Sequence, residues 1–148
     1  MTIRCLSWNE LDTTMLYDIL QLRQEVFIVE QDCPYLDADG KDQDSHHVIF
    51  YNESKLVAYT RLVPKGISYE DYVSIGRVLN HESARGKGIG KDLMNYSIKK
   101  CKELFPNDKI KISAQVYLLK FYQDLGFEET GERYLEDDIP HCGMIYNM

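Results

Sequence analysis

The stretch Arg85-Gly86-Lys87-Gly88-Ile89-Gly90 decides the fold, because it leads directly into a helical run over residues 91–104. Three glycines and two cations ahead of an amphipathic helix leave several backbone N–H groups without partners. The helix dipole makes that end electropositive, and glycine allows an anion to approach the backbone closely. The stretch therefore predicts a loop that holds a phosphate or pyrophosphate.

Two familiar phosphate loops do not fit this spacing. A P-loop needs a Gly-Lys-Ser/Thr triplet, and the chain contains none. A dinucleotide fingerprint needs G-x-G-x-x-G at the first strand–helix turn, whereas Gly86, Gly88 and Gly90 are spaced G-x-G-x-G. The remaining pattern is R-x-x-G-x-G, which begins at Arg85 and lies between a strand and a helix.

Apolar spacing along the chain predicts an α/β (α+β) protein with a mostly antiparallel front half. Strands are expected over residues 3–8, 47–51, 56–63, 72–79, 109–114, 127–134 and 141–146. Helices are expected from a cap at Asp12 to about residues 29–30, over 91–104, and over 116–125. No repeat or linker interrupts this order, so a single domain over residues 1–148 is expected.

Bulk composition limits the function classes. Hydrophobic residues at 44% and charged residues at 28% are typical of a soluble globular protein. A formal net charge of −7 argues against non-specific nucleic-acid binding and against anionic membranes. Four scattered cysteines without a C-x-x-C pair do not predict a zinc site. With no signal peptide or membrane helix visible, a cytoplasmic protein with free thiols is expected.

The R-x-x-G-x-G loop resembles the coenzyme A pyrophosphate loop of the GNAT (GCN5-related) N-acyltransferases. The preceding strand, residues 75–80, and the later Phe121-Tyr122-Gln123-Asp124-Leu125-Gly126-Phe127, similar to the family's F-Y-x-x-x-G-F element, agree with it. Residues 22–31, 33–42 and 134–144 further resemble the ElaA-like branch, so the likeness covers nearly the whole chain. It implies a GNAT fold with a central mixed, mostly antiparallel sheet of six to seven strands flanked by about four helices.

The resemblance implies acetyl-CoA as co-substrate. The strand before the glycine loop would splay from its neighbour and bind the pantetheine amides through its backbone. The N–H groups of the loop would cradle the pyrophosphate. The implied cofactor-binding residues are Val78, Leu79, Asn80, Arg85, Gly86, Lys87, Gly88, Ile89, Gly90 and Lys91.

Tyr122 is the candidate general acid. The resemblance implies that its hydroxyl lies near the coenzyme A sulfur, where it could protonate the departing thiolate. The alternative is a core aromatic residue one helical turn from Leu118 and Leu125.

A candidate general base is harder to assign. Many family members carry a carboxylate on the strand before the glycine loop, but residues 73–80 contain no Asp or Glu and carry Arg77 instead. Candidates must then come from around the acceptor cleft, and transfer without a dedicated base is also open. The acceptor-site candidates are Arg23, Glu30, Asp37, Asp39, His47, Arg77 and His141, with His46 as a further candidate base.

The acidic loop has its own alternatives. Asp37-x-Asp39-Gly40-x-Asp42 resembles a calcium loop, but the order departs from the EF-hand, and its twelfth position is Val48. We therefore expect no metal, and an acidic turn that lines the cleft together with Glu30 and residues 136–138. Arg23, Arg61 and Arg77 lie beside apolar residues, which favours an ion-pair network with these aspartates; recognition of an acceptor carboxylate is the alternative.

These observations predict an N-acetyltransferase that moves an acetyl group from acetyl-CoA to a primary amine in a ternary complex. The acceptor would be a small-molecule or peptide amine, without nucleic acid or membrane, and a homodimer is possible. The alternative is a non-catalytic GNAT-fold sensor that binds an acyl-CoA. The absent strand carboxylate favours the sensor, whereas Tyr122 and the full glycine loop favour the enzyme.

Overall fold

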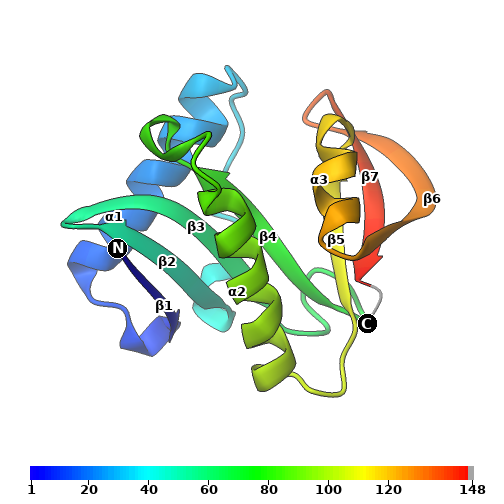
Figure 1. Ribbon diagram of the computed structural model, residues 1–148, viewed down its shortest axis with the longest axis horizontal. Helices are drawn as coiled ribbons and strands as arrows, with labels where there is room; N and C mark the ends of the chain where they lie inside the picture. The colour runs from blue at the N-terminus through cyan, green and yellow to red at the C-terminus, as the bar shows by residue number, and fades with distance from the viewer. Residues whose placement is uncertain (147–148) are drawn as a thin grey trace.

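Seven strands form one sheet in the order β1-β2-β3-β4-β5-β7-β6 in the computed structural model, which describes residues 1–146 (Figure 1). Neighbouring strands are antiparallel except for β4 and β5, which confirms the predicted mixed, mostly antiparallel sheet. The strands are β1 (Thr2–Ser7), β2 (His46–Asn52), β3 (Lys55–Val63), β4 (Val73–Asn80), β5 (Ile110–Gln115), β6 (Phe127–Glu136) and β7 (Ile139–Tyr146).

The described chain has three α-helices, α1 (Thr13–Arg23), α2 (Ile89–Leu104) and α3 (Leu119–Asp124), rather than about four. The Asp12 carboxylate accepts a hydrogen bond from the Met15 N–H at 2.7 Å and caps α1 as predicted. The predicted length of the first helix is reached by a change of pitch, because α1 continues as the π-helix η2 (Gln24–Glu30). The predicted 116–125 helix is shorter, since residues 116–118 form a 3₁₀ turn ahead of α3.

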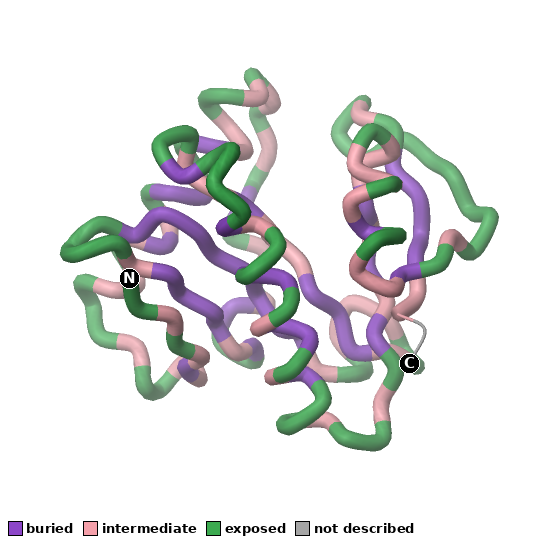
Figure 2. The backbone as a smooth tube through the Cα atoms, in the orientation of Figure 1, coloured by how far each residue is buried: buried purple, intermediate pink, exposed green. Residues whose placement is uncertain are grey.

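The helices cover both faces of the sheet (Figure 1). Apolar residues of α2 and Tyr122 of α3 share one core with inward residues of β2 to β5 and β7. Ile19 and Leu22 of α1 pack in a second, smaller core with Ile49 and Tyr59 on the other face. Burial is concentrated along β2, β3 and the first half of β4, whereas most of β6 is exposed (Figure 2).

β4 and β5 separate soon after they pair. Only Val73 with Ile110 and Ser74 with Lys111 are partners, and beyond them the strands diverge into the opening seen in Figure 1. The expected splay is therefore confirmed.

A β-bulge accounts for the bend of β4. Gly76 lies opposite Arg61 and Leu79 opposite Tyr59, so two residues of β4 face one residue of β3. Arg77, the first of those two, has φ 49°, in the left-handed region that costs a non-glycine residue about 1–3 kcal/mol. The bulge turns the end of β4 away from β5.

Among the described residues, no helix has both the length and the apolar character needed to cross a bilayer.

A cleft between the splayed strands

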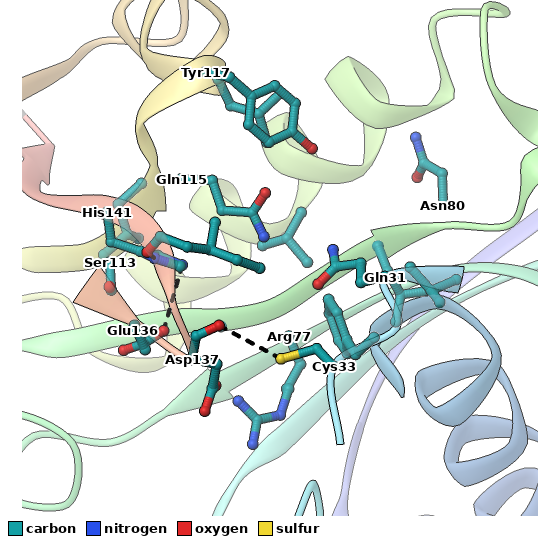
Figure 3. Close-up of a pocket in the computed structure, with 18 of the residues that line it drawn as sticks. Gln31, Cys33, Arg77, Asn80, Ser113, Gln115, Tyr117, Glu136, Asp137 and His141 are labelled. Carbon is teal, nitrogen blue, oxygen red and sulfur yellow. Dashed lines mark hydrogen bonds and ion pairs between the residues drawn. The ribbon is translucent and has the colours of Figure 1, made fainter. Parts of the chain in front are cut away.

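A cleft of about 600 Å³ occupies the opening between β4 and β5 (Figure 3). Its walls come from β4, β5, η2, α3, the residues after η2 and the turn between β6 and β7. This volume lies in the range of small-molecule and cofactor sites. Three of the predicted acceptor-site residues line it, Glu30, Arg77 and His141.

The glycine loop lies at the N-terminal end of α2, beside the end of β4. Gly86 and Gly88 have φ values of 78° and 75°, and a Cβ at either would meet no atom within 4 Å. Glycine is favoured there by backbone conformation, not by crowding. Gly88 is the N-cap residue of α2, so the helix begins inside the loop, two residues before the predicted start. The free N–H groups of its first turn stay close to the glycines.

Gly90 is glycine for a different reason. A Cβ at this position would lie 2.9 Å from Asn80 Nδ2, so a side chain here would push the Asn80 amide aside. Asn80 Oδ1 is buried without a hydrogen-bond partner in the structure. Both residues line the cleft.

The side chains of the glycine loop differ in burial and in their partners. Ile89 is buried in the core, so only its backbone can reach a ligand, whereas Lys87 and Lys91 are exposed. Arg85 folds back to donate to the Asn80 carbonyl at 3.0 Å and to the two Glu30 oxygens at 2.7 and 2.6 Å. These hydrogen bonds hold the pKa of Glu30 below its ordinary value, so Glu30 is a weak proton acceptor. Arg85 thus joins η2 to the end of β4.

The final residues of β4 keep one backbone edge open. Leu79 and Asn80 pair with Tyr59 and Ala58 of β3, but the register with β5 has already ended. The Leu79 side chain packs in the smaller core, and Val78 packs against the larger one. The cores take up the Val78 and Leu79 side chains, which leaves the backbone of these residues on the edge that faces the cleft.

Tyr122 lies in the cleft wall with 6% of its surface exposed. Its ring packs edge-to-face on Phe121 and Phe127, with centroids 5.2 and 5.9 Å away. Burial raises the pKa of Tyr122, which keeps the phenol protonated near neutral pH. Tyr122 is thus a core aromatic residue that also lines the cleft with a protonated phenol.

Most of the aspartates predicted for the cleft bind arginines instead. Arg23 Nε is 2.7 Å from Asp37 Oδ2, and Arg61 Nη1 is 2.8 Å from Asp39 Oδ1. Arg77 Nε is 2.9 Å from Asp37 Oδ1, so the bulge of β4 belongs to the same network. The ion-pair hypothesis therefore holds. Arg23, Asp37 and Asp39 do not line the cleft, because their charges are used in fixing the acidic loop to the sheet.

Two of the candidate histidines also serve packing and hydrogen bonding outside the cleft. His47 is fully buried; its Nε2 donates to the Asp42 carbonyl at 2.9 Å, and its Nδ1 accepts from the Tyr59 hydroxyl at 2.6 Å. Burial lowers its pKa, so the ring is neutral with both nitrogens engaged. His46 packs its ring edge against Phe105, away from the cleft lining. Neither is placed to meet an acceptor.

The far end of the cleft is acidic and holds His141. Glu136 and Asp137 line it, and Glu136 Oε2 is 3.4 Å from His141 Nε2 (Figure 3). Cys33 Sγ donates to the Asp137 carbonyl at 3.6 Å, a contact between residues 104 apart in sequence that links the two walls. Of the acidic residues predicted to rim the cleft, Glu30, Glu136 and Asp137 line it, whereas Asp37, Asp39 and Asp138 do not. The Cys33 contact had no sequence signal.

A strained turn places these groups. Asp137 and Asp138 have φ values of 51° and 62° and form the two-residue connection between β6 and β7. Two left-handed central residues are the geometry of a type I′ hairpin turn, usually made by Asn-Gly. The turn brings Glu136 and His141 to the same end of the hairpin. Ser113 and Gln115 of β5 also line this end, and strand alternation could have revealed them.

A glycine loop at a helix N-terminus, beside a strand edge opened by a bulge, gives the cleft an anion-binding end and a free backbone edge. The sequence matches the family described as the acetyltransferase (GNAT) domain over residues 20–148. The chain belongs to the GNAT family. The family and the fold support an acyltransferase that takes its acyl group from coenzyme A.

Individual relatives agree with this assignment. The chain is 42% identical to the protein ElaA of Escherichia coli K12 over 138 residues, which are 92% of this chain and 90% of ElaA. The crystal structure of E. coli ElaA superposes with a TM-score of 0.93 at 39% identity, covering 99% of this chain and 100% of that one. The crystal structure of an acyl-CoA N-acyltransferase from Pseudomonas aeruginosa superposes with a TM-score of 0.92 at 39% identity, with the same coverage.

A more distant structure shares the fold alone. An aminoglycoside 6′-N-acetyltransferase complexed with coenzyme A superposes with a TM-score of 0.73 at 16% identity, covering 98% of this chain and 96% of that one.

Proposed function

We propose that this protein is an acetyl-CoA-dependent N-acetyltransferase that acetylates a primary amine by direct attack in a ternary complex. The observation that carries the proposal is the open backbone edge of β4, which lies beside the glycine loop and lines the same cleft as Tyr122. The pantetheine arm would lie along that edge, and the pyrophosphate would bind the N–H groups of the loop. The distant relative bound to coenzyme A supports this choice of co-substrate.

The cleft has two chemically different sides. Ile112 of β5 faces the core beneath α2 and α3, so its neighbours Ser113 and Gln115 point to the opposite face of the sheet. His141 pairs with Gln115 and shares that face. Because the cleft is lined by residues of both faces, the opening between β4 and β5 passes through the sheet. Coenzyme A would occupy the α3 side, and the amine would enter from the His141 side.

The proposed chemistry has three parts. Backbone N–H groups beside the β4 bulge would orient the thioester and polarise its carbonyl. The neutral amine would attack the carbonyl carbon, forming the C–N bond as the C–S bond breaks. Tyr122, held protonated by burial, would give its proton to the departing thiolate.

One observation favours a second candidate function. Many relatives hold a proton acceptor on this strand, but β4 carries no Asp or Glu. A protein that binds an acyl-CoA and regulates a partner would need the glycine loop but no base. Turnover with an amine separates this sensor from the enzyme.

Calorimetric titration with acetyl-CoA, coenzyme A and ATP, followed by an assay of thiol release with a panel of amines, tests the proposal. Micromolar binding of the first two ligands with much weaker binding of ATP, and amine-dependent thiol release, would support the enzyme. Binding without turnover would favour the sensor. Absence of coenzyme A binding would refute both.

A matched pair of glycine variants locates the pyrophosphate. Gly88→Asp adds a negative charge at the helix N-terminus, where repulsion should weaken coenzyme A binding at least about 100-fold. Gly66→Asp is the control, because Gly66 also has a left-handed φ (96°) and open space around its Cβ, but lies outside the cleft. Both variants add the same charge at a glycine with a left-handed φ. Equal affinities in the two folded variants would contradict the assigned site.

A further inference from the structure

His141 is fixed in the acceptor side of the cleft. It lies on β7, where it pairs with Gln115 of β5 and Tyr134 of β6, and 6% of its surface is exposed. Its ring stacks on Tyr134 with an interplanar angle of 14°. Since it also lines the cleft, its remaining exposed surface faces the space where an acceptor would enter.

The backbone selects the tautomer of this histidine. His141 Nδ1 is 2.7 Å from the Ile139 carbonyl oxygen. A carbonyl oxygen can only accept, so Nδ1 carries the hydrogen and, in the neutral ring, Nε2 keeps its lone pair. His47 shows the contrast, because both of its nitrogens are used in hydrogen bonds with Tyr59 and Asp42. Among the four histidines, His141 is the one that lines the cleft.

Glu136 completes an arrangement that suits an ammonium group. Its Oε2 is 3.4 Å from His141 Nε2, with the carboxylate side chain 53% exposed and the histidine side chain 8% exposed. When the ring is neutral, two acceptors, a lone pair and a carboxylate, face the same space. An incoming R–NH₃⁺ group can donate to both. When the ring is protonated, the carboxylate stabilises the imidazolium.

Other ionisable groups surround this pair. Tyr134 lies on β6 beside the ring, Tyr69 interacts electrostatically with Tyr134 and Glu136, and Asp137 follows Glu136 in the turn. Across the cleft stand the side chains of Cys33, Tyr35, Arg77, Glu30 and Arg85. Arg77 is paired with Asp37, and Glu30 and Arg85 are paired with each other. Glu136 is therefore the ionised group in direct contact with His141 among the described residues.

We propose that His141 is the general base of the transfer, with Glu136 as its positioning and charge-stabilising partner; this rests on the acetyltransferase function proposed above. Nε2 takes one proton from the acceptor's ammonium group, which frees the lone pair for attack. After the C–N bond forms and the C–S bond breaks, Tyr122 gives its proton to sulfur. The nitrogen of the acceptor then loses a second proton, which restores the Tyr122 hydroxyl. The first proton, held on His141, passes to solvent. The products are the amide, coenzyme A thiol and one proton.

The test is the pH dependence of thiol release at saturating acetyl-CoA, with 1,4-diaminobutane, glycinamide, Nα-acetyl-lysine amide and glucosamine as probe amines. For wild type we expect kcat/KM for the amine to rise with pH through an acidic limb. His141→Asn keeps a donor near the Nδ1 position but has no base at Nε2. It should lower kcat/KM about 100-fold near neutral pH and remove the acidic limb.

Two further variants distinguish a base from a structural residue. Glu136→Gln removes the negative charge beside the ring, so the acidic limb should remain but move to lower pH. His46→Asn is the matched control, since His46 lies outside the cleft lining, and it should leave the profile unchanged. All variants should bind acetyl-CoA within about twofold of wild type, which shows that the cofactor side is intact.

The outcomes separate this inference from the function on which it rests. If wild type releases thiol and His141→Asn keeps the acidic limb, His141 is not the base, but the proposed acetyltransferase function is still supported. If no probe amine gives turnover despite coenzyme A binding, the proposed transfer fails and the role of His141 with it. The tautomer is testable on wild type alone. Nitrogen-15 NMR of labelled histidines should show hydrogen on Nδ1 of neutral His141, and hydrogen on Nε2 would overturn the proposal.

Discussion

Replacing Arg23 with methionine tests whether the buried ion-pair network holds the acidic loop on the sheet. Arg23 is fully buried and donates at 2.7 Å to the Asp37 carboxylate, at 2.7 Å to the Asp42 carboxylate and at 2.9 Å to the Asp37 carbonyl. Methionine retains an unbranched apolar stem but offers no donor. Both carboxylates, 7% and 6% exposed, would lose one cation in a desolvated setting.

The expected cost follows from what remains around these carboxylates. Removing one partner of a buried ion pair costs about 3–5 kcal/mol. Asp37 keeps Arg77 and Asp42 keeps Arg61, so we expect the lower end, about 3 kcal/mol. With an m-value of about 2 kcal/mol/M, the urea midpoint should fall by about 1.5 M. The melting temperature should fall by about 6–12 °C.

An exposed arginine supplies the control. Arg133 is bonded to Glu129 at 2.6 Å, but its side chain is 55% exposed, so Arg133→Met should lower the urea midpoint much less than Arg23→Met does. Urea unfolding monitored by circular dichroism measures both variants under identical conditions. A midpoint shift for Arg23→Met no larger than that for Arg133→Met would refute the claim that the network stabilises the fold.

The same network fixes a pH dependence. Burial tends to raise the pKa of Asp42, but hydrogen bonds and charge from Arg23 and Arg61 outweigh it and hold the pKa below the ordinary value. The pKa of Asp39 is also depressed, by Arg61 and Arg77 against the effect of burial. A depressed carboxylate pKa stabilises the fold above the unfolded pKa of about 4 and ceases to do so as pH falls through the folded pKa. Wild-type stability should therefore fall below about pH 4, and the deficit of Arg23→Met should narrow there.

Two variants probe the cleft itself. Tyr122→Phe should lower kcat at least about 100-fold while the acetyl-CoA dissociation constant stays within about twofold, because only the proton donor is lost; an unchanged rate would return Tyr122 to a purely packing role. Gly90→Ala should weaken coenzyme A binding measured by calorimetry, because its Cβ would displace the Asn80 amide from 2.9 Å, while stability changes by no more than about 1 kcal/mol. Unaltered affinity would show that the placement of Asn80 is immaterial.

Local chemistry makes several features of this chain predictable from its residues. Glycines at positions 86 and 88 indicate left-handed backbone, and the amphipathic run after them indicates a helix, because both depend on neighbours within a few residues. The arginine–aspartate network is predictable as well. Charged residues beside apolar ones must find partners when buried, and the acidic loop offers them.

Choosing among the acceptor-site candidates requires the tertiary structure. His47 and His141 both flank apolar strand residues, yet His47 is buried with both nitrogens in hydrogen bonds, whereas His141 lines the cleft with Nε2 3.4 Å from Glu136. Which face of the sheet a strand residue meets, and what covers that face, depends on elements distant in the chain. The π-helical pitch of residues 24–30 likewise has no local sequence signature.

Short-range pattern and direct similarity of residues are enough to establish the glycine loop, the helix behind it, the succession of strands and the family. Long-range pairing establishes the rest: where β4 leaves β5, how Arg77 is held in a left-handed bulge, and which carboxylates remain for the cleft. Those features join segments tens of residues apart. Their energies belong to the assembled sheet and its packed loop, and no stretch of the chain carries them alone.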